Sequence, residues 1–286
     1  MVNKKIQIVE CPRDAMQGIT TFIPTQDKVN YINSLIKVGF DIIDFGSFVS
    51  PKAVPQMMDT DKVINDLKIR DKTSLLAIVL NKRGALDASS FEQIKILGYP
   101  LSISDFFQKN NSNSDIKSSL SIIDDILDIC LQKNKILLIY FSMAFGNPYN
   151  EDWSVNLLLE YVHKIHQKGI KMISLADTNG KASDKLIADV YSEVYSSFNN
   201  LDIGLHLHTH PDSASAKINS AWNVGCQRFD VSIGGYGGCP FTKSKLIGNL
   251  STEKILNFIA ERNITHSLDI LAFENAYNFS KKIFNL

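Results

Sequence analysis

The chain has 286 residues, of which 44% are hydrophobic and 21% are charged, a composition typical of a globular protein with a substantial core. Its 30 basic and 30 acidic residues cancel, which argues against binding to nucleic acid or to an anionic membrane. No apolar run has membrane-spanning length, no signal segment precedes the first expected strand, and the four cysteines show no paired spacing, so we expect reduced thiols and a cytoplasmic location.

Strand-like and helix-like segments alternate along most of the chain. Apolar runs predict strands at residues 5–10, 41–45, 74–80, 101–104, 136–141, 172–175, 201–208 and 228–233. Apolar residues at helical spacing predict helices at residues 27–38, 60–69, 90–97, 122–132, 158–165, 186–194, 214–224, 252–262 and 268–284. The polar stretch 108–119 is rich in Asn and Ser and is expected to be a loop.

About eight strand–helix units over this length predict a single α/β domain, a (β/α)8 TIM barrel spanning residues 1–286 with extra C-terminal helices. A doubly wound open sheet is the alternative fold. In a barrel, functional side chains lie at the C-terminal ends of the strands. Polar or ionisable residues gather at these ends: Arg13, Asp14, Asp44, Ser47, Tyr140, Ser174, Asp177, Thr178, His206 and His208.

His206 and His208 stand one residue apart at the end of the seventh expected strand. Alternate side chains of a strand leave on the same face, so both imidazoles should point the same way. Two converging imidazoles are typical of a metal site, although a solvent-exposed strand end would carry them equally well. The pair alone does not decide between the two.

Three stretches carry a resemblance that covers essentially the whole chain. They are Val-Glu-Cys-Pro-Arg-Asp-Ala-Met-Gln at 9–17, Ser-Phe-Val-Ser-Pro-Lys-Ala-Val-Pro-Gln-Met at 47–57, and Gly-Gly-Cys-Pro-Phe at 237–241 with Gly-Asn-Leu at 248–250. Together they resemble the hydroxymethylglutaryl-CoA lyase family, within the metal-dependent lyases and acyltransferases built on a TIM barrel. The Arg-Asp-x-x-Gln start is shared across that superfamily, whereas the other two loops are more particular to the lyases.

The resemblance implies a divalent metal cation, Mg²⁺ or Mn²⁺, held by Asp14, His206, His208 and Asn249. It also implies that Arg13 and Cys239 are catalytic and that an acyl-CoA substrate is cleaved to acetyl-CoA and acetoacetate. The implied substrate-binding or supporting positions are Gln17, Ser47, Tyr140, Ser174, Asp177, Thr178 and Glu253. The sequence leaves the oligomeric state open, and a homodimer is one arrangement that it allows.

The chemistry of these residue types agrees with that reading. One carboxylate, two imidazoles and one amide oxygen leave about two of six octahedral positions open for a substrate. A bound dication makes the substrate hydroxyl easier to deprotonate, and either His206 or Asp44 could relay the proton. Arg13 is suited to hold the enolate charge that follows carbon–carbon cleavage. Cys239, on a Gly-rich loop, could protonate the departing carbanion.

Several of these residues could instead have a purely structural role. Arg13 and Asp14 could form a surface ion pair. Asn249 could cap the following helix, and Glu253 could compensate the dipole of that helix. Cys239 could be an inert thiol.

The match departs from the family pattern at three places. The well-known members place an acid four residues before the arginine, where this chain has Val9, and Glu10 is displaced by one residue, which reverses its face in a strand. Asp44 stands where those members have the longer Glu. Thr209 and His210 follow the second histidine, and we expect His210 to be a loop residue. These changes bear on the exact acyl substrate.

Three other functions compete with the lyase. The first is a related aldolase or Claisen-type acyltransferase that acts on another 3-hydroxy acyl or 2-oxo acid substrate with the same metal. The second is a non-haem iron oxygenase, because two histidines and a carboxylate also describe Asp14, His206 and His208. The third is a binding barrel without catalysis, which would tolerate the loss of Arg13.

Overall fold

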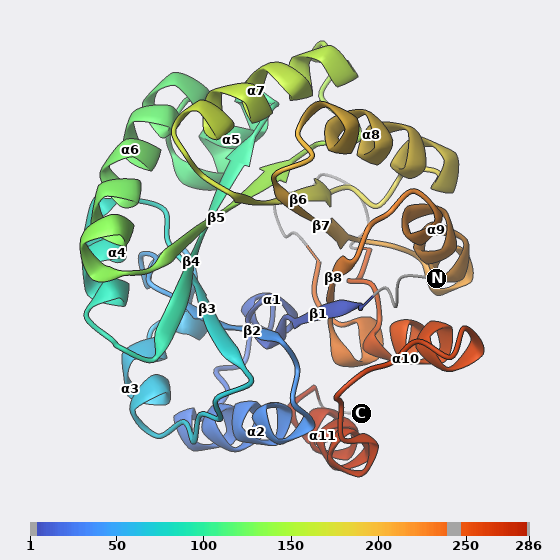
Figure 1. Ribbon diagram of the computed structural model, residues 1–286. Helices are drawn as coiled ribbons and strands as arrows, with labels where there is room; N and C mark the ends of the chain where they lie inside the picture. Colours follow the sequence, from blue (N-terminus) through green and yellow to red (C-terminus); the bar gives the residue numbers. More distant parts are fainter. Residues whose placement is uncertain (1–4, 239–246, 285–286) are drawn as a thin grey trace.

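The computed structural model describes residues 5–238 and 247–284. Eight parallel strands follow one another in sequence order around a closed barrel, and helices surround it (Figure 1). This confirms the predicted TIM barrel. The strands are β1 (Gln7–Glu10), β2 (Ile42–Ser47), β3 (Ser74–Ile78), β4 (Ile94–Ser102), β5 (Ile136–Ser142), β6 (Met172–Asp177), β7 (Asp202–Leu207) and β8 (Arg228–Val231).

Helices connect the strands and cover the outside of the barrel. The α-helices are α1 (Pro12–Gln17), α2 (Thr25–Val38), α3 (Thr60–Asn65), α4 (Lys82–Ser89), α5 (Asp105–Ser112), α6 (Ile116–Lys133), α7 (Val155–Gln167), α8 (Asp184–Ser197), α9 (Pro211–Asn223), α10 (Thr252–Glu261) and α11 (Ile270–Ile283). Two short 3-10 helices are η1 (Pro55–Met57) and η2 (Ile233–Gly235). The last helix, α11, lies beside α2 (Figure 1). Among the described residues, every helix falls short of the length and apolar character needed to cross a membrane.

The strands place apolar side chains on both of their faces, as expected for a parallel sheet that is covered on both sides. Inward-facing residues such as Val9, Leu76 and Leu138 fill the barrel interior. Outward-facing residues such as Ile43 and Leu75 pack against the helices. These two apolar layers leave the strand ends as the place where polar side chains can meet.

A buried arginine fills the barrel near its N-terminal end. Arg228 on β8 is 1% exposed, and it donates from Nε to Asp202 Oδ1 at 3.1 Å and from Nη2 to the Ile173 carbonyl at 2.6 Å. Gly204 on β7 makes room for this side chain, because a Cβ there would lie 2.6 Å from the guanidinium carbon. The opposite, C-terminal end of the barrel is therefore the end left open for chemistry.

Two expectations for the middle of the chain are wrong: the helix at residues 90–97 and the start of the fourth strand at residue 101. Residues 90–97 do not form a helix, because α4 ends at Ser89 and β4 begins at Ile94. The buried Ile94 and Ile96 alternate with the exposed Lys95, which is the period of a strand. As a result β4 is longer than the predicted strand at 101–104 and begins earlier.

The polar stretch 108–119 is largely helical, and the prediction of a loop is wrong. Ser104 begins α5 by accepting a hydrogen bond from the backbone of Phe107, and Asp115 begins α6 in the same way from Ser118. Between the two helices, Asn113 takes the left-handed conformation with φ of 53°. Asn113 and Asp115 of this stretch therefore mark the end of one helix and the start of the next.

Candidate active site

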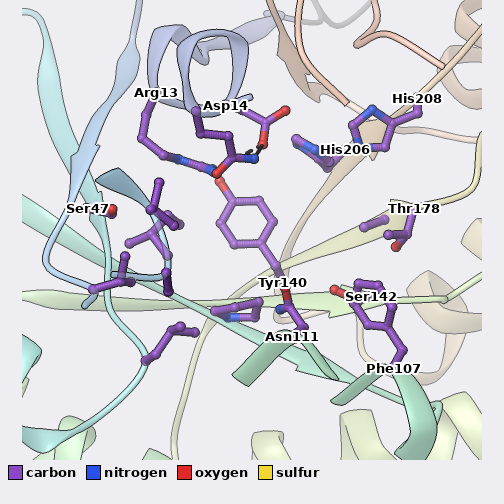
Figure 2. A pocket seen from close by; sticks show the side chains of 18 residues that line it. Arg13, Asp14, Ser47, Phe107, Asn111, Tyr140, Ser142, Thr178, His206 and His208 are labelled. Atoms are coloured by element: carbon purple, nitrogen blue, oxygen red, sulfur yellow. Dashed lines mark hydrogen bonds and ion pairs between the residues drawn. The ribbon is translucent and has the colours of Figure 1, made fainter. Parts of the chain in front are cut away.

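A pocket of about 140 Å³ opens at the C-terminal end of the barrel, where the ends of the strands meet (Figure 2). One wall is apolar and comes mostly from the segments that follow β2 and β3: Val49, Ala53, Val54, Ile78, Leu80 and Phe107. The rest carries polar side chains. The predicted site residues that line the pocket are Arg13, Asp14, Gln17, Ser47, Tyr140, Thr178, His206 and His208.

Helix α1 presents three polar side chains to the pocket from little more than one turn. Arg13 donates from Nη1 to Asp14 Oδ1 at 3.1 Å and to Gln17 Oε1 at 2.9 Å. Gln17 in turn donates from Nε2 to Asp14 Oδ1 at 2.7 Å. Pro12 at the first helical position suits the start of this helix, and residues four apart share a helix face. The turn therefore fixes the guanidinium and the carboxylate relative to each other.

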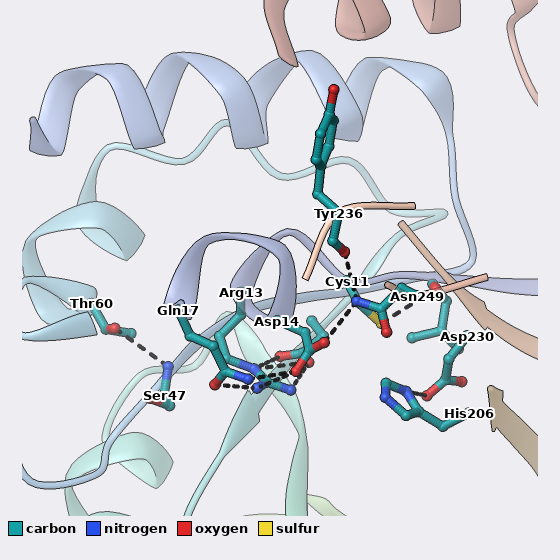
Figure 3. Close-up of polar contacts among 12 residues, drawn as sticks. Cys11, Arg13, Asp14, Gln17, Ser47, Thr60, His206, Asp230, Tyr236 and Asn249 are labelled. Carbon is teal, nitrogen blue, oxygen red and sulfur yellow. Dashed lines mark hydrogen bonds and ion pairs between the residues drawn. The ribbon is translucent and has the colours of Figure 1, made fainter. Parts of the chain in front are cut away.

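Asp44 of β2 holds the other edge of the Arg13 guanidinium, opposite the Asp14 and Gln17 side chains that Figure 3 shows beside Arg13. Arg13 donates from Nε to Asp44 Oδ2 at 3.1 Å and from Nη2 to the same oxygen at 2.6 Å. The side chain of Arg13 is 11% exposed and that of Asp44 is 1% exposed. The side chain of Asp14 is only 7% exposed, so the alternative of a surface ion pair between Arg13 and Asp14 is wrong. Contacts on both edges leave the guanidinium little freedom to move.

The charges of this cluster set its protonation states. Burial raises the pKa of Asp14, but the charges of Arg13 and of the two histidines outweigh burial and lower the pKa to about 2. At Asp44 burial prevails over Arg13 and raises the pKa to about 6. Burial would lower the pKa of Arg13, yet the charges of Asp44 and Asp14 raise it. At neutral pH Asp14 is therefore ionised, whereas the pKa of Asp44 is close enough to neutral pH for this carboxyl to gain or lose a proton.

His206 and His208 face the pocket from the end of β7, as predicted (Figure 2). Their ring centroids lie 5.1 Å apart in an edge-to-face arrangement. His206 Nδ1 lies 3.2 Å from Asp230 Oδ2. Burial alone would lower the pKa of His206, but the hydrogen bond and charge of Asp230 raise it. Burial and His206 lower the pKa of His208 to about 4, so this imidazole is neutral at physiological pH.

Asp14, His206 and His208 form a group in which one ligand atom of each lies within 4.8 Å of the others. Asn249 adjoins this group, because its Nδ2 donates to Asp14 Oδ2 at 2.7 Å and its backbone pairs with that of His208. Its amide nitrogen is thus bonded to Asp14 and not to the start of α10, where Ser251 is the N-cap residue. Among the described residues, the buried His208 Nδ1 has no hydrogen-bond partner. The ionised carboxylate of Asp14 and the neutral imidazole of His208, with its unpaired ring nitrogen, fit a divalent cation.

Three of the predicted substrate-binding residues lie outside the pocket lining. Ser174 accepts a hydrogen bond from Arg228 Nη1 at 3.3 Å inside the barrel. Glu253, in the first turn of α10, accepts from the Gly234 backbone N–H at 2.9 Å. The third, Asp177, is paired with a lysine, as described next. The predicted catalytic Cys239 lies outside the described residues.

A buried lysine connects Asp177 to the backbone of His208. Lys217 of α9 is 3% exposed, and its Nζ donates to Asp177 Oδ2 at 3.1 Å and to the carbonyl oxygens of Gly180 at 3.3 Å and His208 at 3.4 Å. Asp177 itself is 2% exposed. The lysine therefore supports the end of β7 from behind the pocket.

We expect Lys217→Met to lower the free energy of unfolding by about 3–5 kcal/mol, because it leaves the buried Asp177 without its counter-charge. Denaturant-induced unfolding measures the change. The double variant Lys217→Met/Asp177→Asn should recover part of the loss. Lys185→Met, at an exposed lysine of α8, is the matched control and should change stability little. A Lys217→Met protein as stable as this control would contradict the expectation.

Glu10 points away from the pocket, into the junction between β1, η2 and α10. It is fully buried, with Oε1 accepting from the Ile233 backbone N–H at 2.8 Å and Oε2 accepting from Thr252 Oγ1 at 2.6 Å. Val9 faces the barrel interior instead. The one-residue displacement thus reverses the face of the acid, as predicted. Burial raises the pKa of Glu10 to about 8, although the two hydrogen bonds lower it.

Because the folded pKa of about 8 lies above the ordinary value of 4.5, the folded chain keeps the Glu10 proton over a pH range in which the unfolded chain has lost it. The contribution of Glu10 to stability therefore falls as pH rises through this range. We expect Glu10→Gln, which does not titrate, to gain stability relative to the unsubstituted chain by a few kcal/mol between about pH 5 and about pH 8. Urea unfolding across this range measures the difference. Glu261→Gln at an exposed position is the control, and parallel curves for both variants would contradict the assignment.

Sequence reasoning did not identify Asp230, Lys217 or the position of Cys11 as parts of this site. A signal existed in β8, where Arg228 and Asp230 alternate within a buried strand and so face the barrel interior together. A second signal was Lys217 on the apolar face of α9, next to Ile218 in the sequence. Cys11 gave no signal of its own, because a buried cysteine is most often an ordinary core residue.

Comparison with known proteins agrees with this geometry. Residues 5–279 match the HMGL-like family. A hydroxymethylglutaryl-CoA lyase of Bacillus subtilis (strain 168) is 31% identical over 265 residues, which cover 91% of this chain and 87% of that protein. A 3-hydroxy-3-isohexenylglutaryl-CoA/hydroxymethylglutaryl-CoA lyase of Pseudomonas aeruginosa is 31% identical over 278 residues, which cover 96% of this chain and 91% of that protein.

A solved structure is similar over the whole chain. It is an HMG-CoA lyase from Acinetobacter baumannii in complex with coenzyme A and 3-methylmalate, with a TM-score of 0.92 and 29% sequence identity. The similarity covers 100% of this chain and 93% of that one. The family match over nearly all residues, the relatives above 30% identity and the shared barrel lead to one conclusion: the chain belongs to the HMGL-like family.

Proposed function

We propose that this chain cleaves 3-hydroxy-3-methylglutaryl-CoA to acetyl-CoA and acetoacetate in a metal-dependent retro-Claisen reaction. The observation that carries the proposal is the meeting of Asp14, His206 and His208 within 4.8 Å, with the buried guanidinium of Arg13 directly beside Asp14. The relatives named as hydroxymethylglutaryl-CoA lyases support the substrate, and the related structure with bound coenzyme A supports an acyl-CoA.

The residues that would hold the cation are Asp14, His206, His208 and Asn249. Their oxygen and nitrogen donors suit Mg²⁺ or Mn²⁺. When bound, the dication supplies Lewis acidity that makes the substrate hydroxyl easier to deprotonate. Asp14 is already ionised and His208 already neutral at physiological pH, so these two donors need lose no proton before binding.

Arg13 is the group that we assign to the charge formed in the reaction. Carbon–carbon cleavage leaves negative charge on the enolate oxygen of the thioester, and a fixed, largely buried cation stabilises it. Asp44 and Gln17 hold the guanidinium in place before the substrate arrives. Gln17 therefore acts as a positioning residue for Arg13 and Asp14. The buried hydroxyls of Ser47 and Tyr140 have no partner among the described side chains, which leaves them available to the substrate.

We assign acceptance of the hydroxyl proton to Asp44. His206 faces Asp230 with Nδ1, and a cation would take its other nitrogen, so no lone pair would remain for a proton. Asp44 has a pKa of about 6, near the pH at which an acid–base group is most effective. Cys239 is proposed to return a proton to the acetyl carbanion, from the Gly-rich loop that follows η2. We place the reaction in the cytoplasm, a compartment that suits the free buried thiols of Cys11, Cys130 and Cys226.

The proposal is tested with the purified chain stripped of metal by a chelator and then mixed with 3-hydroxy-3-methylglutaryl-CoA. We expect equal amounts of acetyl-CoA and acetoacetate when Mg²⁺ or Mn²⁺ is added, and neither product without a divalent metal. Release of acetyl-CoA without acetoacetate would overturn the proposal, as would no turnover with either metal. Oxygen uptake with Fe²⁺ would instead indicate the oxygenase alternative.

A further inference from the structure

Three side chains form a second group that overlaps the ligands of the proposed catalytic cation at one residue. Cys11, His206 and Asp230 each offer one ligand atom, and these atoms all lie within 4.8 Å of one another. Cys11 follows β1 and is 1% exposed, while Asp230 on β8 is 2% exposed. Figure 3 shows the sulfur of Cys11 on the same side of the site as His206 and Asp230. The two groups share His206.

We propose that Cys11, His206 and Asp230 form a binding site for a dication that accepts sulfur ligands and prefers tetrahedral coordination, such as Zn²⁺. A sulfur, an imidazole nitrogen and a carboxylate oxygen are the donor types that zinc takes in proteins. The catalytic group offers only oxygen and nitrogen donors, which suit harder cations. The sulfur is thus what distinguishes the second group.

The surroundings of the group favour a cation. Within the described part of the chain, Asp230 Oδ1 is buried without a hydrogen-bond partner. A buried carboxylate oxygen is costly to leave unpaired, and a metal ion would satisfy it. Two further carboxylates, those of Asp14 and Asp44, lie close enough to act electrostatically on the Cys11 sulfur, and Arg13 is the cation that opposes them. Three carboxylates against one guanidinium leave a net negative field at the sulfur.

His206 makes the two sites mutually exclusive. Its Nδ1 faces Asp230, so a cation in the second site would bind Nδ1. The ring proton would then sit on Nε2, and this nitrogen could no longer bind the catalytic cation. Binding replaces the thiol proton of Cys11, which leaves to solvent. Zn²⁺ in the second site should therefore inhibit the enzyme by removing one ligand from the catalytic site, and excess Mg²⁺ should relieve the inhibition.

The test uses the metal-free full-length chain and Co²⁺ alone as a spectroscopic probe. Cobalt bound through a thiolate gives an intense near-ultraviolet sulfur-to-metal charge-transfer band, whereas cobalt held by oxygen and nitrogen alone does not. We expect the band to saturate at one equivalent of Co²⁺ in the unsubstituted chain. We also expect Cys11→Ser to lose it, with at least about tenfold weaker Zn²⁺ affinity by chelator competition.

Cys239→Ser is the matched control, because Cys239 is the other cysteine for which a role in the reaction is proposed. This variant should keep the band. A band that persists in Cys11→Ser but is lost in Cys239→Ser would assign the thiolate to the Gly-rich loop and overturn the proposal. The absence of a band from the unsubstituted chain would also overturn it, whether or not either variant folds. Neither result depends on lyase turnover, so the outcome is separate from the test of the proposed function.

Discussion

Arg13→Met is expected to lower the turnover number for acetoacetate release by roughly a thousandfold, with a smaller change in KM. The reason is that the guanidinium stabilises negative charge that develops in the transition state and is absent from the bound substrate. The substitution also removes the partner of the buried Asp44, whose pKa should rise above its present value of about 6. Steady-state kinetics with 3-hydroxy-3-methylglutaryl-CoA measure the effect.

Two further variants separate charge from geometry at this position. Arg13→Lys keeps a cation but loses the paired Nε and Nη2 hydrogen bonds to Asp44, so we expect it to recover only part of the lost rate. Arg83→Met, at a side chain that is 91% exposed, controls for the loss of an arginine and should leave turnover unchanged. If Arg13→Met stays within tenfold of the unsubstituted chain, Arg13 does not hold the enolate charge.

His208→Asn should lower the affinity for Mn²⁺ by at least about a hundredfold and abolish turnover at ordinary metal concentrations. The buried His208 has an unpaired Nδ1 among the described residues and a pKa of about 4, so it offers a neutral donor to the pocket. Isothermal titration of the metal-free protein measures the affinity directly. Near-ultraviolet circular dichroism of the metal-free variant reports whether the barrel is intact.

His210→Asn is the matched control two residues further along the chain. His210 is exposed at the start of α9 and lies outside the metal-ligand group, as expected for a loop residue. We expect this variant to bind Mn²⁺ as the unsubstituted chain does. An equal loss of affinity in both variants would show that the effect of His208→Asn is not one of ligation.

The barrel was predictable because its strands are continuous apolar runs separated by amphipathic helices. The errors arose where a local pattern had two readings. Residues 94–97 combine apolar side chains that fit a helix or a strand, and pairing with β3 and β5 decides for the strand. The helix α1 was not foreseen, because a six-residue segment that begins with Pro12 is too short to show periodicity.

The meeting of Asp14, His206 and His208 was predictable for a different reason. All three lie at or just after strand ends, and the ends of parallel strands meet at one face of a barrel. The partners of these residues were not predictable in the same way. Asp230 meets His206 only through the register of β7 and β8, and Lys217 meets Asp177 only through the packing of α9. Register and helix packing are properties of the folded chain that no local pattern contains.

The bonds of Asn249 to Asp14 and of Thr252 to Glu10 join positions 235 and 242 residues apart. During synthesis, a nascent chain that has emerged through β7 already carries Asp14, His206 and His208. It still lacks the Asn249 amide and the Thr252 hydroxyl, which make these two bonds. We therefore expect the complete group of proposed cation ligands to form only after Asn249 has emerged. A product truncated after β8 should therefore keep all eight strands, yet lack one proposed cation ligand and one hydrogen-bond donor to the buried Glu10.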